Sequence, residues 1–152
     1  MTAPDPSPPT GGTGLGHRSV SMTRVEQGLY EVTNPRGGTM RVGGGGETQE
    51  FTAVELFLTA MAACSATDVD FITSRIAEPE SFDVVSAGEK MKDEDGNHLG
   101  DIEITVRVRF PEGPDGDRAR ERLPRAVAQS RDRLCTVSRT VQRGAEIAYR
   151  VD

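Results

Sequence analysis

The chain has 152 residues, a formal net charge of −6 and a sequence pI near 5.0. This length fits one domain, and a content of 35% hydrophobic and 5% aromatic residues predicts a lean core, which favours association with a second subunit. The acidic balance argues against a nucleic-acid or anionic-membrane surface, because such a surface needs a basic field.

The N-terminal residues 1–16 are rich in proline and glycine and have neither the basic start nor the apolar run of a signal peptide. We expect a disordered tail there, followed by one domain over residues 17–152. The longest apolar run, residues 54–66, is too short to span a bilayer and contains a glutamate, so no transmembrane helix is expected. The protein is therefore predicted to be cytoplasmic, where Cys64 and Cys135 are free thiols or a working redox pair.

Short β-type runs alternate with turn signals between residues 19 and 42, which predicts three antiparallel strands. The glycine run at 43–46 predicts a flexible hinge, because no phosphate-loop lysine follows it. A central helix is then predicted from residue 53 to about residue 75. Thr52 and Glu55 have the spacing of a capping box at its start. Because this helix is apolar on every face, it must be enclosed on all sides.

Residues 82–92 and 101–110 flank a turn-rich loop and predict a long hairpin. Apolar and polar side chains alternate through the second strand, so one face of the hairpin is expected to be exposed to solvent. The loop is not expected to bind calcium, because its glycine falls at the fourth position and an isoleucine stands where a bidentate glutamate is required.

An amphipathic helix is predicted over residues 115–133, with a kink at Pro124. Two helical turns after Cys135 are expected to end at Gly144, before a final strand over residues 145–151. The order of strands, helix, hairpin, helix and strand predicts an α+β fold, with antiparallel sheet packed on helices. The predicted buried face of the amphipathic helix holds Ala119, Leu123, Ala126, Val127 and Leu134.

The sequence favours thiol chemistry over the other common kinds of site. His17, next to the predicted tail, and His98, in the hairpin turn, are poorly placed for a cysteine-histidine dyad. The cysteine spacing matches no zinc motif and nucleotide-binding motifs are absent, so neither a metal nor a nucleotide cofactor is predicted. A working thiol needs a nearby arginine or a helix N-terminus. Cys135 precedes a short helix, so physical reasoning alone favours Cys135 as the nucleophile.

Two segments resemble the OsmC/Ohr family of bacterial thiol-dependent hydroperoxide reductases. FTAVELFLTAMAAC, residues 51–64, is similar to the apolar helix that leads to the first cysteine of that family, and RLCTVSRTV, residues 133–141, is similar to its second cysteine segment. The order of elements also fits from about residue 20. The resemblance implies an OsmC-like fold, an intertwined homodimer with active sites at the interface, an organic hydroperoxide as substrate and no bound cofactor. An external dithiol such as dihydrolipoamide would be the reductant.

The resemblance also implies roles for individual residues. Cys64 would attack the peroxide and become a sulfenic acid, which Cys135 would resolve as a disulfide. The family uses an arginine to polarise the thiolate, and Arg24 and Arg41 are equal candidates for it. An acid holds that arginine, and Glu55 serves either in this role or only as a helix cap.

Many relatives have that acid one position earlier, where this chain has Val54. Two other classes of function therefore stay open. One is a non-enzymatic stress or apolar-ligand-binding dimer, whose phenotype would survive the loss of both cysteines. The other is a thiol redox sensor with slow peroxide turnover, which a rate measurement separates from an enzyme.

Overall fold

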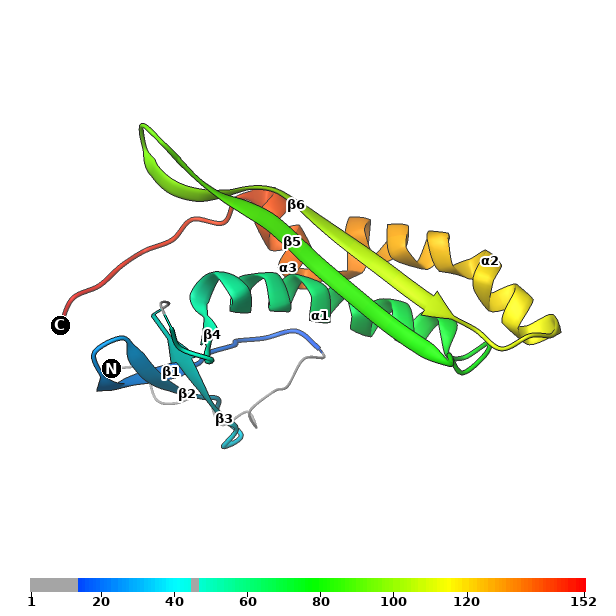
Figure 1. Cartoon of the computed structure of the whole chain (residues 1–152), viewed down its shortest axis with the longest axis horizontal. Helices are drawn as coiled ribbons and strands as arrows, with labels where there is room; N and C mark the ends of the chain where they lie inside the picture. The colour runs from blue at the N-terminus through cyan, green and yellow to red at the C-terminus, as the bar shows by residue number, and fades with distance from the viewer. Residues whose placement is uncertain (1–13, 45–46) are drawn as a thin grey trace. The chain divides into compact units, whose positions relative to one another are not determined.

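The computed structural model describes residues 14–44 and 47–152 (Figure 1). The chain divides into two compact units, residues 1–56 and residues 57–152. The N-terminal unit holds a small sheet and the first turn of a long helix, and the C-terminal unit holds the rest of that helix, a hairpin and further helices.

The predicted N-terminal tail lies outside the described residues except for residues 14–16, which form an exposed bend. Residues 45 and 46 of the predicted hinge also lie outside them. Of the other two glycines in that run, Gly43 ends a strand, and the N–H of Gly44 donates to the carbonyl of Gly28 at 2.7 Å.

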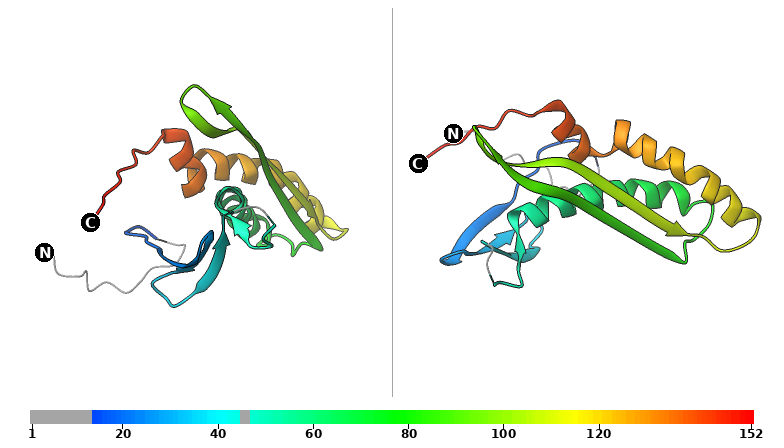
Figure 2. Two further views of the ribbon diagram at one scale, coloured as in Figure 1. Left: turned by 60° about the vertical axis from the view of Figure 1, so that its left-hand side comes forward. Right: turned by 45° about the horizontal axis from the view of Figure 1, so that its top comes forward.

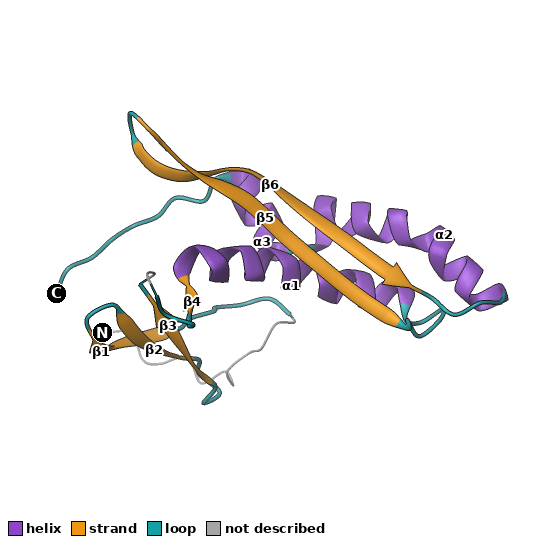
Figure 3. Cartoon of the chain, viewed as in Figure 1, coloured by secondary structure: helices purple, strands orange, loops and turns teal. Residues whose placement is uncertain are grey.

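The three predicted N-terminal strands form an antiparallel meander, which confirms that prediction (Figure 3). Gly28 turns the chain between the first two strands at a φ of 76°, a conformation that favours glycine. The side chain of Asn34 accepts two backbone N–H groups in the second turn. The strands are β1 (Ser21–Glu26), β2 (Leu29–Thr33) and β3 (Thr39–Gly43), and a short β4 (Phe51–Thr52), which was not predicted, pairs parallel with β3.

The two faces of this sheet differ in polarity. Directly paired residues on neighbouring strands point to the same face. Arg24 pairs with Tyr30 and Tyr30 with Val42, so Arg24 shares a face with these two side chains, of which Val42 is buried. Arg41 pairs with Glu31 on the opposite face. The two candidate arginines therefore point to opposite sides of the sheet.

The central helix, α1 (Ala53–Thr73), begins at the capping box predicted from the sequence. The N–H of Thr52 donates to the carboxylate of Glu55 at 2.9 Å, and the N–H of Glu55 donates to the Thr52 hydroxyl at 3.3 Å. The bond from the Thr52 backbone, and then the contact with its side chain, lower the pKa of Glu55 because they favour the carboxylate. The predicted start of α1 is confirmed, and its end lies close to the predicted one.

The apolar character of helix α1 extends beyond residues 54–66, the run from which membrane spanning was judged. By length and composition alone this helix could cross a membrane, with 21 residues and a mean hydropathy of 1.3 in its most apolar window. The expectation of no transmembrane helix stays a prediction, but its argument from length considered only residues 54–66, whereas the helix continues through the apolar residues Val69 and Phe71. A single such helix is weak evidence for a membrane span, since the core helix of a soluble protein passes the same test.

A long antiparallel hairpin, formed by β5 (Ser81–Asp93) and β6 (Gly96–Arg109), dominates the C-terminal unit. The strands run into the segment predicted as a loop, and only Glu94 and Asp95 connect them. The turn is this tight because the Asp93 carboxylate accepts the N–H groups of Asp95 and Gly96 at 2.8 and 3.1 Å.

Helices lie along one face of this hairpin (Figure 2). The side chains of Ile102, Ile104 and Val106 on β6 line a cavity against the helices. Glu103 and Arg107, which alternate with them, are exposed. The predicted solvent-exposed face of the hairpin is therefore confirmed.

The predicted amphipathic helix is α2 (Pro114–Gln129), and it continues into one π-helical turn, η1 (Ser130–Leu134). In this turn the N–H of Cys135 donates to the carbonyl of Ser130 at 2.9 Å, which is the i to i+5 bond of a π-helix. The wider turn shifts the helical phase. Leu134, predicted on the buried face, is 44% exposed, whereas Ser130 and Cys135 are buried. Pro124 lies inside α2 without ending it.

The last helix, α3 (Thr136–Arg143), ends at Gly144 in a left-handed conformation, as predicted. The predicted strand over residues 145–151 is wrong for this chain, because this described segment has no strand structure (Figure 3). A strand requires a partner for its backbone N–H and carbonyl groups. The alternating apolar side chains that suggested it, Ile147, Tyr149 and Val151, are 77%, 90% and 98% exposed.

Candidate active site

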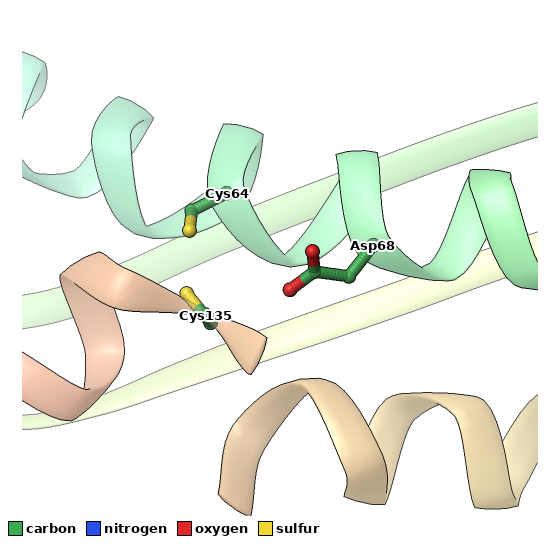
Figure 4. Close-up of side chains that lie close together, drawn as sticks. All are labelled: Cys64, Asp68 and Cys135. Atoms are coloured by element: carbon green, nitrogen blue, oxygen red, sulfur yellow. The ribbon is translucent and has the colours of Figure 1, made fainter. Parts of the chain in front are cut away.

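Two helices bring the cysteines together within the C-terminal unit (Figure 4). Cys64 lies in the middle of α1, and Cys135 is the N-cap residue of α3. The Sγ atoms of Cys64 and Cys135 and a carboxylate oxygen of Asp68 all lie within 4.8 Å of one another. Both cysteines are free thiols; Cys64 is half-buried and Cys135 is fully buried. The fold thus places the two predicted thiols within reach of a disulfide, which needs a sulfur separation of about 2.05 Å.

Hydrogen bonds hold Cys135 in place at the start of α3. Its Sγ accepts the N–H of Ser138 at 3.4 Å, so the sulfur takes the part that a hydroxyl or carboxylate oxygen usually has at an N-cap. The hydroxyl of Ser65, the next residue after Cys64, also donates to this sulfur at 3.8 Å. These contacts match the helix N-terminal environment that the sequence predicted for Cys135.

Asp68 is a member of the cluster that the sequence reading missed. It lies four residues after Cys64 on α1, so both side chains project from the same face of the helix. The hydroxyl of Ser130, which is 1% exposed, donates to Asp68 Oδ2 at 2.8 Å. The i, i+4 spacing of Cys64 and Asp68 was visible in the sequence. The approach of Ser130 was not, because it joins residues that lie 62 positions apart in the chain.

The surroundings of Cys64 do not favour its thiolate. Burial, followed by the hydrogen bond with the Cys135 thiol, raises the pKa of Cys64 to about 11. The negative charges of Cys135 and Asp68 act in the same direction, and a hydrogen bond with the backbone of Val137 acts against them. No basic side chain of the described residues contributes to this shift in the pKa of Cys64. A cation that came close to Cys64 would therefore change its reactivity strongly.

A cavity of about 510 Å³ lies beside the thiols. Three serines connect it to the cluster, because Ser65 and Ser138 contact the sulfur of Cys135 and Ser130 binds Asp68. This volume falls in the range of small-molecule sites. Most of its wall is apolar and comes from Met61, Val69, Ile102, Ile104, Val106, Val127 and Val141.

The other predicted site residues lie in the N-terminal unit. Glu55 is in the capping box of α1, Arg24 is on β1, and Arg41 is on β3 opposite Glu31. Their predicted actions on the thiols of the C-terminal unit stay predictions.

A central apolar helix, a long antiparallel hairpin and two facing thiols from separate helices define a small α+β dithiol protein. The chain belongs to the family of OsmC-like proteins, whose family model matches residues 44–150. This match confirms the resemblance found in the sequence. A comparison with curated protein sequences gives no match.

Solved structures share the fold. An OsmC-like protein of unknown function from Vibrio cholerae has a TM-score of 0.68 at 12% identity, with 84% of this chain and 95% of that chain covered. An organic hydroperoxide resistance protein OsmC from Legionella pneumophila has a TM-score of 0.57 at 17% identity, with coverage of 86% and 92%. The organic hydroperoxide resistance protein OhrB of Bacillus subtilis has a TM-score of 0.55 at 17% identity, with coverage of 85% and 93%. At these identities the likeness shows the fold alone.

Proposed function

We propose that this protein is a thiol-dependent peroxidase that reduces organic hydroperoxides through Cys64 and Cys135. The observation that carries the proposal is the pair of free thiols, whose sulfur atoms lie within 4.8 Å of each other. Membership of the OsmC-like family supports it, as do the names of two structural neighbours, which are organic hydroperoxide resistance proteins.

Exposure supports Cys64 as the thiol that meets the peroxide, since Cys64 is half-buried and Cys135 is fully buried. The Cys64 thiolate attacks one peroxide oxygen, the O–O bond breaks, and the alcohol leaves after taking up a proton. The resulting sulfenic acid condenses with the Cys135 thiol to give a disulfide and water. An external dithiol such as dihydrolipoamide then reduces the disulfide, so the cycle needs no bound cofactor. Free thiols of this kind suit the reducing cytoplasm, where we propose that the protein acts.

The cavity beside the thiols supports an organic substrate. Its wall is mostly apolar, so it favours an alkyl group over the second hydroxyl of hydrogen peroxide. Each buried methylene contributes about 0.8 kcal/mol, so about three of them favour the organic substrate by roughly one to two orders of magnitude in kcat/KM.

One equivalent of cumene hydroperoxide is expected to convert both thiols of the reduced protein into an intramolecular disulfide. Stopped-flow mixing followed by thiol counting measures the loss, and peptide mapping identifies the Cys64–Cys135 link. Two thiols that remain free, or links between chains only, would contradict the proposal. Hydrogen peroxide, used in parallel, tests the substrate class. If it oxidises the thiols as fast as cumene hydroperoxide or faster, the apolar cavity does not select an organic substrate.

A second candidate function is favoured by one observation. The raised pKa of Cys64 leaves little thiolate at neutral pH, as expected of a thiol redox sensor that forms the same disulfide slowly. If the peroxide oxidises the protein thiols about as slowly as it oxidises a small free thiol, the sensor is favoured over the peroxidase.

The protein is expected to be a homodimer in dilute solution. Helix α1 leaves Phe71 60% exposed, and Ile147, Tyr149 and Val151 form an alternating apolar segment that pairs with no strand of the described residues. A second copy would cover such surfaces and supply an edge for the segment. Light scattering at micromolar concentration should give the mass of two chains.

Replacing Ile147, Tyr149 and Val151 by serine should shift that mass towards one chain. The matched control replaces Glu146 and Arg150 of the same segment by glutamine and should leave the mass unchanged. A monomeric wild-type protein would contradict the prediction.

A further inference from the structure

We propose that Cys64, Asp68 and Cys135 form a zinc site in the reduced protein. Their donor atoms, two sulfurs and one carboxylate oxygen, lie within 4.8 Å of one another. They come from two elements, since Cys64 and Asp68 lie one turn apart on α1 and Cys135 lies at the start of α3 (Figure 4). This proposal goes beyond peroxide reduction and requires only reduced thiols.

The donor spacing suits a tetrahedral metal. Zinc binds thiolate at about 2.3 Å and carboxylate at about 2.0–2.2 Å, so its ligand atoms lie roughly 3.5–3.8 Å apart. Small side-chain rotations would close the observed separations to these values. Three protein ligands leave the fourth position to water, as in zinc sites that keep an open coordination place.

The chemistry of the donors selects the kind of metal. Two thiolates favour zinc or a softer ion over magnesium and calcium, which prefer oxygen ligands throughout. The carboxylate of Asp68 adds a negative charge next to both sulfurs. In the absence of a cation this charge opposes thiolate formation. When a divalent cation is bound, the carboxylate becomes its third ligand.

The neighbours of the cluster hold two of the three ligands in position. The Ser130 hydroxyl donates to Asp68 Oδ2 at 2.8 Å and leaves the other oxygen of the carboxylate for a metal. Ser65 and the N–H of Ser138 fix the sulfur of Cys135. Outer hydrogen bonds of this kind orient the ligands of metal sites and tune their affinity.

The site would exist only while the thiols are reduced, because a disulfide has no thiolate to offer. Its oxidation by a hydroperoxide balances as the zinc dithiolate plus R′OOH plus two protons, giving the disulfide, R′OH, water and free Zn²⁺. The two thiolates are oxidised and the peroxide oxygen is reduced. Zinc and peroxide therefore compete for the same pair of sulfurs.

Metal titration of the reduced, full-length protein under anaerobic conditions tests the proposal. Calorimetry with Zn²⁺ should show one ion per Cys64–Cys135 pair, and Cd²⁺ should produce a sulfur-to-metal charge-transfer absorption. The oxidised protein should show neither. Asp68→Asn, which keeps the shape of the side chain, should weaken zinc binding at least tenfold, and the matched control Asp70→Asn on the same helix should leave it unchanged.

Equal zinc affinity of Asp68→Asn and the wild type would overturn the site, because the two thiols alone would then explain the binding. Failure of the reduced wild type to bind zinc would also overturn it. If Asp68→Asn does not fold by circular dichroism, Ser130→Ala replaces it and should weaken binding by roughly tenfold to a hundredfold. A protein that fails to consume peroxide but binds zinc in this way would refute the proposed function and leave the metal site standing.

Discussion

Cys64→Ser is expected to abolish peroxide consumption with any reductant, whereas Cys135→Ser should complete one turnover and then stop. The first variant lacks the half-buried thiol that we propose meets the peroxide. The second keeps that thiol but lacks the buried thiol that would resolve the sulfenic acid. The first variant should therefore leave the peroxide unreacted, whereas the second should accumulate oxidised Cys64.

The trapped state of Cys135→Ser provides the measurement. A dimedone-type probe should label Cys64 after one equivalent of cumene hydroperoxide, and excess peroxide should convert the same sulfur to the irreversible sulfinic acid. Mass spectrometry of the labelled peptide separates these products. Circular dichroism of both variants controls for the fold, because Cys135 accepts the N-cap hydrogen bond from Ser138 and a serine there retains an acceptor.

The reverse pattern would exchange the roles of the cysteines. If Cys135→Ser is inert and Cys64→Ser is the variant trapped as a sulfenic acid, then the N-terminus of α3 decides which thiol reacts. The structure offers an argument against that result, since Cys135 is 0% exposed and a peroxide could reach its sulfur only after local movement.

The parts of the fold that were predicted correctly depend on residues close together in the sequence. The capping box of Thr52 and Glu55, the alternation along β6 and the glycine that ends α3 are each encoded within a few positions. The turn of the hairpin was misjudged because its tightness comes from one side chain, Asp93, which binds the backbone of the turn.

The parts of the fold that were missed depend on contacts between distant residues, or on a change of helical phase, which no local sequence pattern contains. A final strand was predicted from the alternation of Ile147, Tyr149 and Val151, but pairing requires a neighbouring backbone. The π-helical turn shifts the phase by one residue, so Leu134 is exposed and Cys135 is buried. Asp68 lies near Cys135 because α1 packs beside the start of α3, a contact that no local sequence pattern contains.

Arg24→Met is expected to slow the first turnover by roughly tenfold to a thousandfold at neutral pH. The proposed peroxidase needs a cation near Cys64, because burial and the neighbouring thiol raise the pKa of Cys64 to about 11. An opposite charge within about 4–6 Å lowers such a pKa by roughly 1–3 units, and each unit changes the thiolate fraction about tenfold below the pKa. Arg24 is replaced first, because it shares the apolar face of its sheet with Tyr30 and Val42.

Arg41→Met is the matched control. It removes the same charge from a neighbouring part of the same sheet, but Arg41 lies opposite Glu31 on the polar face, so the rate should change little. An unchanged rate for Arg24→Met together with a slow Arg41→Met would transfer the role to Arg41. Normal rates for both would leave the raised pKa of Cys64 uncompensated by either residue and would favour the redox sensor.

The pH dependence separates loss of activation from a general disturbance of the fold. The reactive form is the thiolate, so the rate should rise with pH until it passes the pKa of Cys64 and then level off. If Arg24 approaches Cys64 in the wild type, its charge should lower that pKa and bring the plateau towards neutral pH. In Arg24→Met the rate should keep rising towards the pKa of about 11 that the C-terminal unit imposes, so the deficit should shrink as the pH increases. Stopped-flow rates with cumene hydroperoxide from about pH 6 to about pH 10 provide this test, and a deficit that stays constant across that range would exclude thiolate activation by Arg24.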